Sequence, residues 1–111
     1  MPTLADLHAR LAAFPGAVME RPFGPEVAVY KVGGKVFAIC GDGLSFKVTE
    51  IGFEVLTSDG LGRQAPYCAK GQWVNIHLDR LEPDDAAGWL ATAHSLIAGK
   101  LTKKARAELG L

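Results

Sequence analysis

The sequence lacks a net charge, because 12 Asp and Glu residues match its 12 Lys and Arg residues. Nucleic-acid-binding domains usually carry a basic excess, since phosphate contacts supply most of their non-specific affinity. Any nucleic-acid site in this chain must therefore arise from local clustering of cations. No apolar run is long enough to cross a bilayer, and no basic stretch leads into an apolar one at the N-terminus. We expect a cytoplasmic protein that does not bind membranes.

Residues for catalysis and metal binding are also scarce. The only cysteines, Cys40 and Cys68, lie far apart without a Cys-x-x-Cys pair, which is typical of a reducing compartment. The three histidines have no metal-ligand spacing, and no phosphate-binding or dinucleotide motif is present. Cys68, His77 and Asp79 could serve as nucleophile, base and orienting group, but their spacing matches no family signature. We expect no enzymatic activity, no metal and no cofactor.

The length and apolar content predict one domain over residues 1–111. Its 111 residues are near the common domain size, and 49% of them are hydrophobic, enough for one packed core. Hydrophobic periodicity and Gly- or Pro-containing breaks predict the order α-β-β-β-β-α-β-α. The predicted elements are a helix over 3–14, strands over 18–23, 27–32, 35–40 and 44–48, a helix after Thr49, a loop over 58–71, a strand over 72–78, and a helix from Pro83 followed by a basic tail from Lys100.

Short turns between these strands predict an antiparallel sheet, and the helices would cover one of its faces, giving an α+β fold. The Gly33-Gly34 pair between two Val- and Phe-rich runs is the clearest turn, because the favoured hairpin turns need a positive φ at central positions. In the last helix the buried stripe is expected to contain Trp89, Leu90, Ala93, Leu96 and Ile97.

Strand alternation predicts what the other sheet face carries. Val74, Ile76 and Leu78 point one way in their strand, so the intervening residues point the other way. If the aliphatic sets pack beneath the helices, the opposite face carries Ser45, Lys47, Trp73, Asn75 and His77. An exposed Trp beside polar groups is typical of a surface that binds a partner or ligand. The alternative is an ordinary solvated sheet face, with Trp73 packed on a lysine stem or under the long loop.

Lysines offer a second candidate surface. We expect Lys31 and Lys35, which bracket the Gly33-Gly34 turn, to project near each other. A nucleic-acid-binding wing would combine Lys31, Lys35, Lys47 and Lys70, with Lys103, Lys104 and Arg106 of the tail as support. The alternative is a sheet edge that lysines keep soluble.

Several of these segments, taken in order, resemble the MmcQ/YjbR family. They are Pro22-Phe23-Gly24, the hairpin from Tyr30 to Ala38, Phe46-Lys47-Val48, Trp73-Val74 and Leu101-Thr102-Lys103-Lys104. The resemblance covers nearly the whole chain and implies a CyaY-like, double-wing α+β fold with a DNA-binding role. It points to Phe23, Lys31, Lys35, Lys47 and Trp73. Before the tryptophan the family often has a basic or polar pair, where this chain has Gly71-Gln72 after Lys70.

Two functional hypotheses follow from these patterns. The leading one is a non-catalytic binding module with DNA as its partner. The other is a protein-interaction or small-ligand-binding module that uses the sheet face around Trp73. Salt separates them, because phosphate binding weakens steeply with ionic strength and a contact anchored by an aromatic ring does not.

Overall fold

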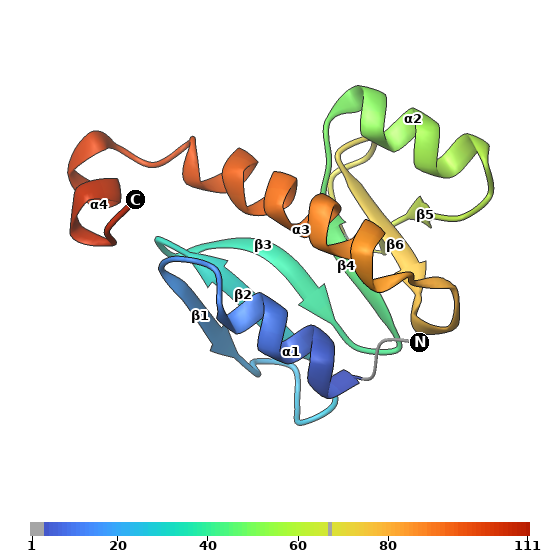
Figure 1. Cartoon of the computed structure of the whole chain (residues 1–111), viewed down its shortest axis with the longest axis horizontal. Helices are drawn as coiled ribbons and strands as arrows, with labels where there is room; N and C mark the ends of the chain where they lie inside the picture. The colour runs from blue at the N-terminus through green and yellow to red at the C-terminus, as the bar shows by residue number, and fades with distance from the viewer. Residues whose placement is uncertain (1–3, 67) are drawn as a thin grey trace.

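A six-stranded antiparallel sheet organises the chain (Figure 1). The computed structural model describes residues 4–66 and 68–111. The strand order is β1-β2-β3-β4-β6-β5, and every neighbouring pair is antiparallel. The strands are β1 (Ala17–Glu20), β2 (Ala28–Val32), β3 (Lys35–Cys40), β4 (Gly43–Lys47), β5 (Arg63–Gln64) and β6 (Trp73–His77).

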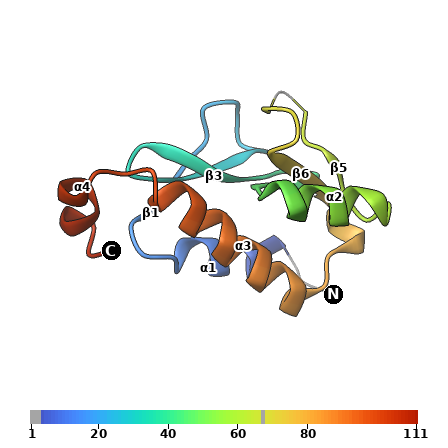
Figure 2. The ribbon, with the colours of Figure 1, turned by 90° about the horizontal axis from the view of Figure 1, so that it is seen from above.

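The helices cover one face of this sheet, as predicted. The helices are α1 (Leu4–Ala12), α2 (Glu50–Ser58), the 3₁₀ turn η1 (Leu78–Arg80), α3 (Pro83–Ala98) and α4 (Lys103–Glu108). Figure 2 shows α1 and α3 on one side of the sheet, whereas two loops rise on the other side. We call them loop A (residues 21–27) and loop B (described at residues 65–66 and 68–72). None of the described helices is long and apolar enough to pass through a membrane.

The main core lies between the sheet and the helices. Phe46 of β4 is fully buried, and its ring stacks on Trp89 of α3 with centroids 5.9 Å apart. Val74 and Ile76 are also fully buried, which confirms the predicted alternation of β6. Trp89 itself is half-buried at the margin of the stripe. The other core residues include Leu7, Leu11, Phe37, Leu44, Leu90, Ala93 and Ile97.

Some predicted boundaries were wrong for identifiable reasons. The first strand ends at Glu20, and its predicted continuation belongs to loop A. Leu78 is half-buried in η1 and does not extend β6. The predicted loop over 58–71 contains β5, where Gly62 approaches the sheet so closely that a Cβ would lie 2.4 Å from Val74 Cγ1. Thr49 caps α2 as expected, whereas Thr3 lies outside the described residues.

The Gly33-Gly34 hairpin has the predicted turn but a different arrangement of lysines. Gly33 and Gly34 have φ values of 58° and 80°, as a turn with two left-handed positions requires. Lys35 pairs with Val32, which points into the core, whereas Lys31 pairs with Val36 on the other face. The side chains of Lys31 and Lys35 therefore leave opposite faces of the sheet, and the expectation that they project together was wrong.

Candidate functional site

A groove lies on the sheet face that the helices leave open, between loops A and B. Its volume is about 640 Å³, within the usual range for small-molecule sites. Phe23 and Val27 of loop A, Pro66 of loop B and Ile39 of β3 form its apolar walls. A second hollow of about 370 Å³ shares Phe23, Ile39 and Cys68 with the groove and extends it to Val36, Lys31 and Trp73.

The floor of the groove carries a polar pair. Ser45 and Asn75 are partners in register on β4 and β6, and Asn75 Nδ2 donates a 2.9 Å hydrogen bond to Ser45 Oγ. His77 lies one step along the same face, and its Nδ1 is 3.4 Å from Asp79 Oδ2. The strand register thus places Ser45, Asn75 and His77 on the face where alternation predicted them.

Trp73 and Lys47 are also register partners on this face, but neither is exposed as expected. Trp73 is half-buried and lines the second hollow with Cys68 of loop B. Lys47 is only 7% exposed, and its Nζ donates a hydrogen bond to Gln72 Oε1. Burial lowers the pKa of Lys47, and the nearby positive charge of Lys100 lowers this pKa further. The Lys47 ammonium group is therefore buried and hydrogen-bonded within the fold, and it is not presented to a partner.

We expect Lys47→Met to raise the free energy of unfolding at pH 7 by up to about 1 kcal/mol, because a buried ammonium is poorly compensated by one neutral acceptor. Since the pKa of Lys47 is lower in the folded state, the penalty is complete below that folded pKa. The penalty disappears as the pH rises towards the unfolded value of 10.5. Urea unfolding at pH 7 and pH 10 should therefore show the stability gap between variant and parent closing with pH.

The exposed Lys35 provides the control for this substitution, since Lys35→Met should leave the urea midpoint nearly unchanged. A loss of stability in Lys47→Met at pH 7 would show that the hydrogen bond to Gln72 outweighs the cost of burial.

The four lysines of the predicted wing have different surroundings. Lys31 Nζ forms a 2.9 Å ion pair with Glu20, and Lys47 is buried. Lys35 projects from the other sheet face, and Lys70 is exposed on loop B. The hairpin alone therefore does not form the predicted wing.

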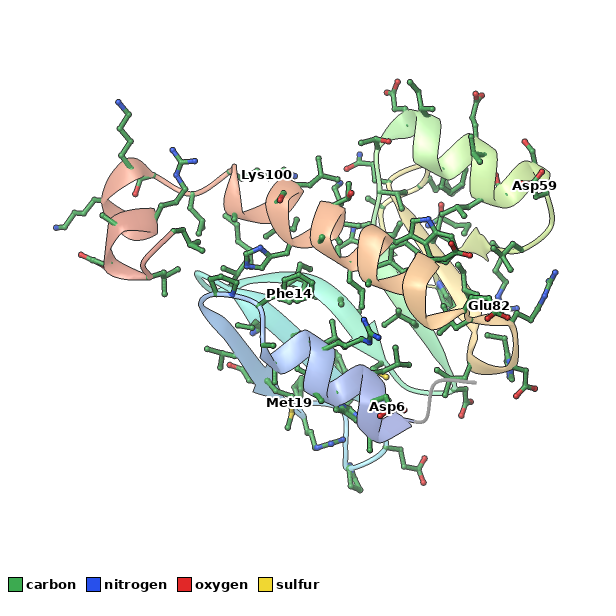
Figure 3. The ribbon with its side chains drawn as sticks, viewed as in Figure 1. Asp6, Phe14, Met19, Asp59, Glu82 and Lys100 are labelled. Atoms are coloured by element: carbon green, nitrogen blue, oxygen red, sulfur yellow. The ribbon has the colours of Figure 1, made fainter. Side chains whose placement is uncertain are left out.

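Another group of cations gathers at one end of the molecule. Leu101 packs over the hairpin, because a Cβ on Gly33 would lie 2.6 Å from Leu101 Cδ1. This contact holds α4 beside the turn, and nitrogen-tipped side chains project outward from α4 (Figure 3). We call this surface the basic end, and it comprises Lys35, Lys100, Lys103, Lys104 and Arg106.

The basic end is little neutralised by acids. Within residues 4–66 and 68–111 none of its five cations has an ion pair, and Glu108 is the acidic residue of α4. Asp59 and Glu82 lie towards the opposite end of the molecule from Lys100 (Figure 3). The zero net charge of the whole chain therefore conceals a local excess of positive charge at the basic end. A local field of one sign attracts charged partners.

Neither thiol has the lowered pKa of an activated nucleophile. His77 and Asp79 are in contact, but burial raises the pKa of the Cys68 thiol, which is opposite to the shift of an activated nucleophile. Cys40 is buried in the core, and burial raises its pKa as well. Among the described residues no three His, Cys, Asp or Glu side chains gather closely enough to hold a metal ion.

Sequence reasoning missed two charged residues at these surfaces. Arg63 lines the groove from β5, a strand of two residues that is too short to produce a pattern. Lys100 was assigned only to a basic tail, and the signal that could have placed it was Leu101, an apolar residue in that tail that needs a packing partner.

The comparisons with known proteins agree with this architecture. None of the curated proteins matches the chain in sequence. The crystal structure of the Deinococcus radiodurans protein DR2400, which has a DUF419 domain, superposes with a TM-score of 0.88 at 27% identity, covering 100% of this chain and 90% of that one. The sequence model of the YjbR family matches residues 12–96, which include β1 to β6 and most of α3. The chain therefore belongs to the YjbR family.

Proposed function

We propose that this protein is a binding module that contacts nucleic-acid phosphates through its basic end. The observation that carries the proposal is a group of five cations that form no ion pair with any described residue. They are assembled from the β2–β3 hairpin and the C-terminal segment. Lys and Arg contacts to phosphate give affinity without reading sequence. This placement also accommodates the neutral composition, because only one end of the molecule would face the polyanion.

The basic end suits a phosphate backbone better than the hairpin lysines alone. Its lysines are exposed, so binding would not first have to break an ion pair such as Lys31–Glu20. They also project from two segments that the Gly33–Leu101 contact holds together. The expected binding is weak, similar for different duplex sequences and strongly dependent on salt.

The test is the double variant Lys103→Gln/Lys104→Gln, measured by fluorescence anisotropy with labelled duplexes of two unrelated sequences. We expect about a tenfold or greater loss of affinity at 50 mM salt for both sequences, with a shallower dependence on salt, because fewer counterions are released. Arg10→Gln/Arg63→Gln is the matched control, since it removes two charges outside the basic end and should retain most of the affinity.

No duplex binding by the parent protein at low salt would reject the proposal. An equal loss in both double variants would also reject it, because binding would then follow net charge and not the basic end.

The groove favours a second function, namely a small-ligand-binding module on the open sheet face. It lies between two loops and offers apolar walls with a few polar groups, an arrangement typical of ligand sites. A flat surface for a protein partner would be less enclosed. Phe23→Ala should weaken any ligand held there without affecting binding at the basic end.

A further inference from the structure

The groove ends at a small cluster of two arginines and a histidine at the β5–β6 edge. Arg63, His77 and Arg80 line a hollow of about 240 Å³ there. Arg63, Asn75 and His77 line both this hollow and the larger groove, so the two spaces meet at these side chains. An apolar groove that leads to such a cluster has two chemically distinct halves.

Arg63 is the cation of this cluster that remains available. It pairs with Asn75 across the sheet, which directs both side chains to the groove face. Arg80 instead donates a 2.6 Å hydrogen bond to the Gly60 carbonyl oxygen, and His77 contacts Asp79. Arg63 is exposed and has neither an ion pair nor a hydrogen bond within residues 4–66 and 68–111. Its planar guanidinium suits a carboxylate or a phosphate.

Two further polar residues of the groove, Asn75 and Asp42, affect which ligand charge it favours. Asn75 uses one Nδ2 hydrogen for Ser45, and the amide carries a second donor. Asp42 lines the groove from the β3–β4 turn and is its acidic member. Asp42 precedes Gly43, the register partner of His77, so it lies towards the same end of the groove and would disfavour an anion that approached it. The groups of the groove that favour an anion are Arg63 and Asn75.

The remaining walls suit an apolar body. Phe23 is 76% exposed although it is a large aromatic residue, and it faces the groove together with Ile39. These two residues also line the second hollow towards Trp73, so the apolar path is elongated. Covering Phe23 with a hydrocarbon chain would remove apolar surface from water, which is favourable.

We propose that the groove binds a small amphipathic organic anion. Its carboxylate or phosphate contacts the Arg63 guanidinium and the Asn75 amide, and its hydrocarbon part lies between Phe23 and Ile39. This inference deepens the second function proposed above and does not depend on nucleic-acid binding at the basic end. Trp73 lies on the hydrocarbon path and reports occupancy through its fluorescence.

The test uses the full chain with Trp89→Phe, which leaves Trp73 as the single tryptophan. Decanoate, decyl phosphate, decanol and decyltrimethylammonium are titrated below micelle-forming concentrations while fluorescence is recorded. We expect saturable binding of at least one of the two anions, about tenfold tighter than decanol, because a charge-assisted hydrogen bond adds about that factor. Preference between the anions identifies the head group.

Variants separate the two halves of the site. Arg63→Gln should weaken the preferred anion about tenfold and leave decanol unchanged, whereas Arg10→Gln on the helix-covered side is the charge-matched control. Phe23→Ala should weaken all alkyl probes alike. No saturable binding of either anion, equal affinity for decanol, or tighter binding of decyltrimethylammonium would overturn the proposal. None of these results bears on the duplex assay, so the failures of the two functions are distinguishable.

Discussion

Replacing Phe46 with alanine should destabilise the protein by about 3–5 kcal/mol, among the largest effects expected of any single substitution. Phe46 is fully buried in β4, and its ring stacks on Trp89. Its register partners Ala38 and Val74 are also fully buried, so the backbone on both sides is held by the sheet and cannot collapse into the space. Equilibrium unfolding in urea, followed by circular dichroism, measures the loss.

Phe23→Ala is the matched control, because it removes the same side chain from a position that is 76% exposed. We expect its free energy of unfolding to change by less than about 0.5 kcal/mol. If Phe46→Ala lost no more stability than Phe23→Ala, the assignment of the helix-covered face as the main core would be wrong.

The sheet and its two faces were predictable because they follow from local periodicity. Alternation in residues 73–77 fixed which side chains of β6 enter the core, and Val74 and Ile76 do so. The Gly33-Gly34 turn followed from the need for positive φ, which both residues have. These features depend on neighbours in the chain, and a single sequence records them directly.

The groove was not predictable, because its walls come from segments distant in the chain. Phe23 and Cys68 line the same hollows, but strands β2 to β5 lie between them along the chain. The short β5 gives Arg63 its place through pairing with Asn75, and two residues carry no readable period.

Charges were the least predictable feature. Lys31 resembled a free cation in the sequence, yet its ion pair with Glu20 depends on the pairing of β1 with β2. Lys47 was expected on an open face, but burial beside Gln72 removes it from solvent. Composition gives the total charge of zero, and only the fold gathers five of the cations at one end of the molecule.

The contact between Gly33 and Leu101 gives the second large expected effect. Gly33 and Gly34 both have positive φ, so an alanine at either position is strained by about 1–2 kcal/mol. They differ in their surroundings: a Cβ on Gly33 would lie 2.6 Å from Leu101 Cδ1, whereas a Cβ on Gly34 would have no atom of the described residues within 4 Å. Overpacking of this kind adds about 1–3 kcal/mol. Comparing alanine substitutions at the two glycines therefore distinguishes the cost of backbone strain from the cost of displacing Leu101.

We expect Gly33→Ala to lower the free energy of unfolding by about 2–5 kcal/mol, and Gly34→Ala by about 1–2 kcal/mol, since only the first displaces Leu101. Urea unfolding of both variants is repeated in a Leu101→Ala background, where the difference between them should fall below about 0.5 kcal/mol. Because Leu101 holds α4 beside the hairpin, Gly33→Ala should also speed amide hydrogen exchange in Lys103–Glu108 more than Gly34→Ala does. Equal losses of stability in the two glycine variants, with equal exchange in α4, would show that Leu101 does not anchor the basic end to the turn.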